Sequence, residues 1–158
     1  MNTSIQGRQK QSGMAIIEFT IALPLMLILF VGTAEVGRLL YDYNTLTKAQ
    51  RTGARHLATH AETGNTDIYV VSGSQYATEA TNLVVFGTID GSGTPLLPNL
   101  SAANVTLDDP TQNEVRVTVS YNYVPMIFTT LPGFGVVSDI PLGLTLSSSV
   151  TMRALRGG

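Results

Sequence analysis

The longest hydrophobic stretch of the chain lies close to its start. Residues 14–34 contain one charged side chain, Glu18, and no charge follows it until Glu35. As an α-helix this stretch extends about 31 Å, close to the ~30 Å hydrocarbon core of a bilayer. No second stretch of comparable length and hydrophobicity follows. The pattern therefore predicts a single membrane-spanning helix.

The helical pattern continues beyond this stretch with one apolar face. Apolar or small residues recur every three or four positions at Val36, Leu39, Tyr43, Leu46, Gly53, Ala54, Leu57 and Ala61. Lys48, Arg51 and Arg55 fall on the opposite face. We therefore predict one long helix over residues 14–61, with residues 14–35 lipid-compatible and residues 36–62 amphipathic.

The remaining part, residues 63–158, changes to patterns of short helix and strand. A second helix is predicted to begin with a capping box formed by Ser72 and Gln75 and to end near Gly87. A short strand is expected before it, over residues 67–72. The second helix is followed by a loop rich in glycine and proline.

Apolar and polar residues alternate strictly over residues 115–123 and again over residues 140–152. This period of two predicts antiparallel strands with one buried face. A shorter strand is expected over residues 105–107, joined to the next by a turn at residues 108–110. We predict an α+β domain in which the amphipathic half of the long helix covers this small sheet.

Charge sets the expected orientation and excludes some partners. Arg8 and Lys10 are the only charges before Glu18, so the positive-inside rule places the N-terminus in the cytoplasm, although the arginines beyond the span favour the opposite. From Glu62 onward eight acids face three arginines, a net charge of −5, which argues against nucleic-acid binding. The chain has no cysteine, which excludes disulfides and a thiol nucleophile.

The sequence contains no recognisable catalytic or cofactor motif. His56 and His60 are spaced for one metal ion but lack the intervening glutamate of a zinc-protease motif. No nucleophile elbow, Walker A loop or dinucleotide fingerprint occurs. Residues 90–93 and 108–109 lack the ligand spacing of a calcium loop and are better explained by turn chemistry. We expect no enzyme activity, no cofactor and no metal.

The most informative residue is Glu18, because a charge within the hydrocarbon costs about 2.5–3.5 kcal/mol on insertion scales. Glu18 is the fifth residue after Gly13, and the basic leader ends at that glycine. This arrangement resembles a class III prepilin signal. The segment also resembles the TadE-like family of the tight-adherence (Tad) pilus system, on the residues Ile17, Glu18, Phe19, Leu23, Pro24, Gly32, Glu35, Gly37, Arg38, Gly53, Ala54 and Arg55.

The resemblance implies a pilin-like fold and a non-enzymatic role as a minor pilin or pseudopilin. A prepilin peptidase would remove residues 1–13 by cutting between Gly13 and Met14. The new amine of Met14 would then pair with Glu18, which Phe19 follows, within one subunit or between neighbours. The implied partners are other pilin and pseudopilin subunits and the inner-membrane assembly platform of a pilus for surface adherence. Relatives of the TadF type share this layout, and an uncleaved assembly factor is a related alternative.

A different class of protein fits the same N-terminus. Residues 1–34 would serve as a secretory signal peptide, because Gly32 and Ala34 supply small residues before a cleavage point. They would also serve as a plain anchor. In either case residues 63–158 would be a secreted or membrane-anchored periplasmic binding domain. Glu18 argues against both, since neither an anchor nor a signal needs it.

Charged residues beyond the span are candidates for subunit contacts. Glu35 and Arg38 are three residues apart and form either a local ion pair, worth about 0.2–0.5 kcal/mol, or a contact to a neighbouring subunit. The basic face formed by Lys48, Arg51 and Arg55 is either solvated or docks on an acidic partner surface. The acidic distal domain of another copy would provide such a surface.

Overall fold

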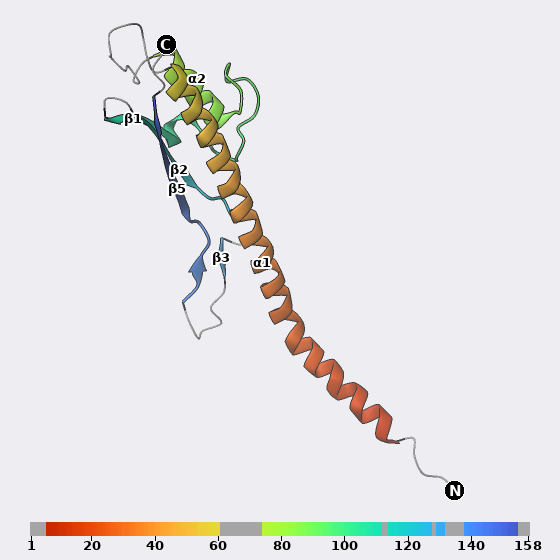
Figure 1. Ribbon diagram of the computed structural model, residues 1–158. Helices are drawn as coiled ribbons and strands as arrows, with labels where there is room; N and C mark the ends of the chain where they lie inside the picture. Colours follow the sequence, from red (N-terminus) through yellow and green to blue (C-terminus); the bar gives the residue numbers. More distant parts are fainter. Residues whose placement is uncertain (1–5, 61–73, 112–113, 128, 132–137, 155–158) are drawn as a thin grey trace. The chain divides into compact units, whose positions relative to one another are not determined.

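The computed structural model describes residues 6–60, 74–111, 114–127, 129–131 and 138–154. The chain forms two compact units, residues 1–38 and residues 39–158. Helix α1 (Gln6–His60) passes through both units, and it is drawn from red to yellow in Figure 1. The predicted long helix is thus confirmed, and it begins earlier than expected, at Gln6.

The larger unit contains a three-stranded antiparallel sheet in the order β1-β2-β5. Its strands are β1 (Val105–Thr111), β2 (Glu114–Asn122) and β5 (Thr145–Arg153). A separate two-stranded ladder joins β3 (Thr130–Leu131) to β4 (Ile140–Pro141). Helix α2 (Gln75–Val85) and a 3₁₀ turn (Ala102–Asn104) complete the unit. The predicted α+β class is confirmed.

Strand β2 is the centre of the core. Its inward residues Val115, Val117, Val119 and Tyr121 are almost fully buried. Pairing with β1 on one side and β5 on the other protects both edges, so every second side chain enters the core. The alternation in the sequence predicted this strand correctly.

The two flanking strands differ from the prediction. The alternating stretch over residues 140–152 is interrupted, because β4 ends at Pro141 and β5 begins only at Thr145. Between them Leu144 accepts a hydrogen bond from the Tyr123 amide at 2.8 Å, and Pro141 has no N–H to donate. The predicted turn at residues 108–110 is wrong. Strand β1 continues through these residues to Thr111, with an irregularity in its register that an edge strand tolerates at a proline.

Helix α2 is present but begins with a different cap. The Ser74 hydroxyl accepts a hydrogen bond from the Ala77 amide at 3.1 Å, so the capping residue is Ser74 and not Ser72. Gly87 follows the helix with a φ of 77°, which confirms the expected glycine stop. Residue 72 and the expected strand over residues 67–72 lie outside the described residues.

Helices α1 and α2 pack closely and run in opposite directions. A Cβ atom placed on Gly53 of α1 would lie 2.7 Å from Val84 Cγ2 of α2. Further along α1, His56 contacts Glu79 at 2.8 Å, and the ring of His60 stacks on Tyr76 with centroids 4.8 Å apart. The partner numbers fall as the α1 numbers rise, so the pair is an antiparallel helical hairpin.

The same hairpin holds one ionisable group in a defined hydrogen-bond network. Glu79 accepts hydrogen bonds from Gln75 at 2.7 Å and from His56 at 2.8 Å. These two bonds hold the pKa of the Glu79 carboxyl below its ordinary value, and the bond from Gln75 has the larger effect. Glu79 therefore remains ionised at neutral pH and well into the acidic range.

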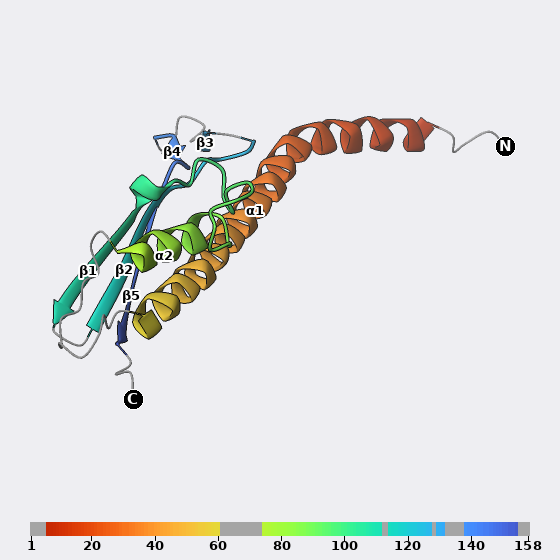
Figure 2. The ribbon, with the colours of Figure 1, turned by 90° about the horizontal axis from the view of Figure 1, so that it is seen from above.

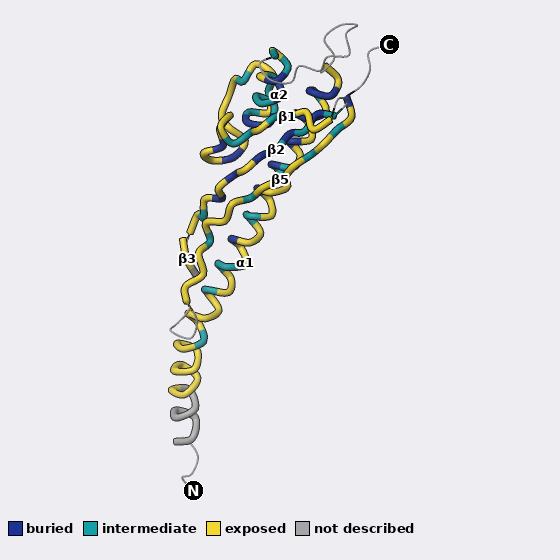
Figure 3. Tube along the Cα trace, turned by 90° about the vertical axis from the view of Figure 1, so that its left-hand side faces the viewer, coloured by how far each residue is buried: buried dark blue, intermediate teal, exposed yellow. Residues whose placement is uncertain are grey.

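Both helices lie on one face of the sheet, as Figure 2 shows. Leu46, Ala54 and Leu57 of α1 are buried on the side that faces the core, and Figure 3 shows buried positions gathered between the helices and the sheet. Gln50 is also fully buried. Its Nε2 donates to the carbonyl of Val117 in β2 at 2.6 Å and to that of Ser148 in β5 at 2.9 Å.

The loop after α2 contains an Asx turn rather than a cation site. Asp90 Oδ1 accepts from the Ser92 amide at 3.2 Å and from the Ser92 hydroxyl at 2.9 Å. The flanking Gly91 and Gly93 have φ values of 70° and 104°, which favour glycine. The turn chemistry predicted for residues 90–93 is therefore confirmed.

Candidate membrane anchor and processing site

The first unit presents apolar side chains around the whole helix. Apart from the half-buried Ile28, the large apolar side chains between Met14 and Phe30 are between 39% exposed, at Leu23, and 73% exposed, at Phe30. In the part of the chain that the structure describes, α1 is the one helix long and apolar enough to cross a membrane. A helix with an apolar surface on all sides requires lipid or other apolar helices around it.

Most polar groups of this segment are compatible with lipid. Thr20 Oγ1 donates to the Ile16 carbonyl at 2.7 Å, and Thr33 Oγ1 donates to the Leu29 carbonyl at 2.8 Å. These bonds lower the cost of placing a hydroxyl in hydrocarbon. Glu18 is different: its side chain is exposed and makes no hydrogen bond or ion pair with any described residue.

Gly13 has no structural role that the described residues explain. A Cβ atom at Gly13 would meet no atom within 4 Å, and its φ is not in the left-handed region. Glycine costs about 1 kcal/mol relative to alanine inside a helix, so packing and conformation both favour another residue here. The contrast with Gly53, where α2 leaves no room for a side chain, is clear.

Met14 and Glu18 are four positions apart along α1. On a helix, side chains at this spacing lie on one face with their Cβ atoms about 5–6 Å apart. An amine created at Met14 would therefore lie within reach of the Glu18 carboxylate of the same chain. It would be equally accessible to a neighbouring helix, because both side chains are exposed.

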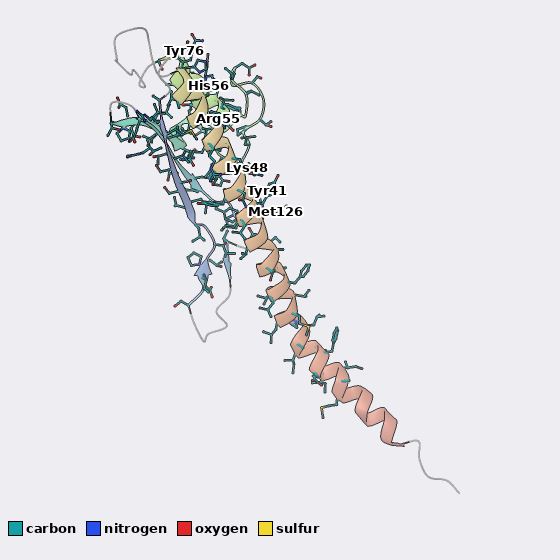
Figure 4. The ribbon with its side chains drawn as sticks, in the orientation of Figure 1. Tyr41, Lys48, Arg55, His56, Tyr76 and Met126 are labelled. Carbon is teal, nitrogen blue, oxygen red and sulfur yellow. The ribbon has the colours of Figure 1, made fainter. Side chains whose placement is uncertain are left out.

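The charged residues beyond the span occupy two kinds of position. Glu35 is buried, at 4% exposure, and Arg38 is half-buried. Lys48, Arg51 and Arg55 are exposed, as predicted, and form no ion pair with any residue in the described ranges. Figure 4 labels Lys48 and Arg55 on the α1 surface.

The structure describes no metal centre. No group of three or more histidine, aspartate or glutamate side chains suited to a metal ion occurs among the described residues. His56 and His60 have ring centroids 4.5 Å apart, but His56 Nε2 already contacts Glu79 and His60 Nδ1 contacts the His56 carbonyl. The two histidines therefore belong to the helical hairpin.

The comparison with protein families concerns the part of α1 described above. Residues 13–55 match the family model described as TadE-like protein. This part of the chain is therefore similar to TadE-like proteins. The matched segment begins at Gly13, includes Glu18 and ends at Arg55, so it confirms the resemblance seen in the sequence. Comparisons with curated proteins and with solved structures find no match.

The likeness to TadE-like proteins is confined to residues 13–55, all of which lie in α1. The match ends at Arg55, before α2 and the sheet, so it covers the apolar segment and most of the remaining part of α1. The apolar part of α1 is consistent with a single membrane anchor. Sequence reasoning located this segment completely, but it did not find Gln50 or Glu79, whose partners come from distant parts of the chain.

Proposed function

We propose that the chain is a minor pilin or pseudopilin that is cleaved between Gly13 and Met14 and takes part in assembling a Tad pilus. The supporting observation is that Gly13, which no packing contact explains, precedes Glu18 on the apolar part of α1. The Glu18 carboxylate has no partner among the described residues. Glycine before the scissile bond gives a prepilin peptidase free access to the backbone.

Cleavage would supply the partner that Glu18 lacks. It removes Arg8 and Lys10 and creates a positively charged amine on Met14, four residues before the carboxylate. In hydrocarbon each charge is costly alone, and pairing reduces the cost. A pair between neighbouring subunits would fix the axial register of otherwise similar apolar helices, so we favour the intermolecular pair.

N-terminal sequencing of the mature protein tests the processing step. A first residue of Met14 supports the pseudopilin. A first residue of Glu35 would identify a signal-peptidase product, and an intact Met1 would identify a membrane-anchored factor. Gly13→Leu should prevent cleavage, whereas the matched variant Gly37→Leu, at a glycine that also has open space around it, should leave cleavage intact.

The role of the carboxylate is tested separately by Glu18→Gln. This variant keeps the size of the side chain and removes its charge. We expect normal cleavage but little incorporation into pili, measured by immunoblotting of sheared surface fractions, while Glu18→Asp should retain part of the incorporation. Normal incorporation of Glu18→Gln would refute the proposed pair.

A further inference from the structure

An exposed apolar surface lies outside both the anchor and the core. We call it the apolar rim: Val124, Met126, Ile127, Ile140 and Leu144, which are between 38% and 75% exposed. These residues flank the β3–β4 ladder. No charged residue occurs over residues 117–138, and Asp139 is the one charge within residues 117–152. An exposed apolar surface of this kind marks a site of interaction.

The apolar rim lies at the end of the unit where its helix begins. Strand β2 and helix α1 run in opposite directions, as Figures 1 and 2 show, and Gln50 contacts the Val117 carbonyl. From Val117 to Asn122 the strand advances about 16 Å, and from Gln50 back to Leu39 the helix covers about the same distance. The end of β2 is therefore level with Leu39, and the rim follows β2 directly.

Side chains at this end support that placement. Figure 4 labels Met126 and Tyr41 in the same part of the view, and both are exposed, at 75% and 70%. Leu39 packs against the core near the same end. Tyrosine is enriched at membrane interfaces, where its ring lies among the headgroups.

The length of the chain keeps this end close to the bilayer. Leu39 follows Ala34, the last residue of the predicted span, by only five positions. That segment covers about 8 Å as a helix and at most about 18 Å when fully extended. Whatever the orientation of residues 39–158, the start of their helix therefore remains near the headgroup region, which adds about 5–8 Å on each side of the hydrocarbon core.

We propose that the apolar rim inserts into the headgroup–acyl boundary of the bilayer that holds the anchor. This inference rests on the membrane anchor of the proposed function, and it does not depend on cleavage. Methionine, isoleucine and leucine side chains suit that boundary, and the anchor holds them beside it at high effective concentration. The domain would thus contact the membrane at two places, and the second contact would restrict its tilt.

The absence of cysteine makes a direct test simple. The Met126→Cys variant of the full chain is labelled with a nitroxide and reconstituted into phosphatidylethanolamine–phosphatidylglycerol vesicles. The control is Thr78→Cys, an exposed position on α2. We expect the Met126 label to be several-fold more accessible to oxygen than to a water-soluble nickel chelate, and the Thr78 label to show the opposite preference. The same result in phosphatidylcholine vesicles would indicate apolar insertion rather than headgroup charge.

Two results would overturn the inference. Equal access of the nickel chelate to both labels would place the rim in water. Protection at Met126 that disappears when labelled chains are diluted into excess lipid would identify another copy as the partner. Carbonate extraction separates these results from failure of the anchor. A chain that stays in the membrane with an exposed Met126 label refutes only the insertion of the apolar rim. A chain that is extracted refutes both the insertion and the membrane anchor.

Discussion

Gly53 lies at a close contact between α1 and α2, and Gly53→Ala tests that contact. The added Cβ would lie 2.7 Å from Val84 Cγ2 and 2.8 Å from the carbonyl oxygen of Ala80. Real Cβ atoms do not approach other atoms this closely. The Val84 side chain is fully buried, and the Ala80 oxygen belongs to the backbone, so α2 itself must shift to relieve the contact.

The expected cost follows from two opposing terms. Replacing glycine by alanine inside a helix gains about 1 kcal/mol, whereas overpacking a core costs about 1–3 kcal/mol. Because one of the two contacts is with backbone, the cost lies in the upper part of that range. We expect the free energy of unfolding of the domain to fall by about 1–2 kcal/mol.

The measurement is urea unfolding of the full chain in detergent. Near-ultraviolet circular dichroism of the buried Tyr121 and Tyr123 reports on the domain and not on the anchor helix. The matched control is Gly37→Ala on the same helix, where the new Cβ meets nothing within 4 Å. This control should leave the unfolding midpoint unchanged or raise it.

A midpoint for Gly53→Ala equal to or above that of the unmodified chain would refute the close approach of α1 and α2. A double variant gives an independent check. If the contact is real, Gly53→Ala combined with Val84→Ala should cost less than the sum of the single variants, because the smaller side chain removes one of the two clashes.

Three further predictions concern other contacts. Gln50→Glu places a carboxylate against the carbonyl oxygens of Val117 and Ser148. The free energy of unfolding should therefore fall by more than about 3 kcal/mol at neutral pH and recover partly in acid. An unchanged urea midpoint would contradict the burial of Gln50. The folded-state pKa of Glu79 is lowered, so the ionised carboxylate stabilises the fold. This stabilisation is complete above the ordinary carboxyl pKa of about 4.3 and is lost as the pH falls through the lower folded-state pKa. Glu79→Gln should therefore lose less thermal stability than the unmodified chain between about pH 5 and pH 3, and equal losses would refute the network. Arg55→Glu should change stability by less than about 0.5 kcal/mol, since the side chain is exposed, yet reduce incorporation into pili; normal incorporation would rule out the proposed subunit contact.

The sequence pattern predicts those elements whose surroundings are uniform along their length. Strand β2 pairs with β5 along its whole length and with β1 over residues 114–119, so its alternation alone locates it. Over residues 140–152 the alternation is as regular, but pairing with β2 is possible only up to Asn122, and Thr145 is its partner there. The pattern of one strand contains no information about where its neighbour ends.

Local chemistry was equally ambiguous where two similar residues compete. Ser72 and Ser74 both precede α2, and only the backbone path decides which hydroxyl reaches a free helix amide. Gln50 lies on the apolar face of α1, four positions after Leu46 and three before Gly53, but its polar side chain does not count toward a hydrophobic pattern. It is buried because two carbonyls from separate strands accept its protons. The anchor segment needed no such tertiary information, since Gly13 and Glu18 are unusual in the sequence itself.

The packing of α1 within residues 39–158 has a mechanical consequence. This part of the helix carries Gln50 and Leu57 into the core, so a force along its axis acts directly on the contacts with the sheet. Strand β2 lies antiparallel to this helix, and the load would act along their interface. The contacts would be sheared together rather than opened one after another, a geometry in which many weak interactions resist extension at once.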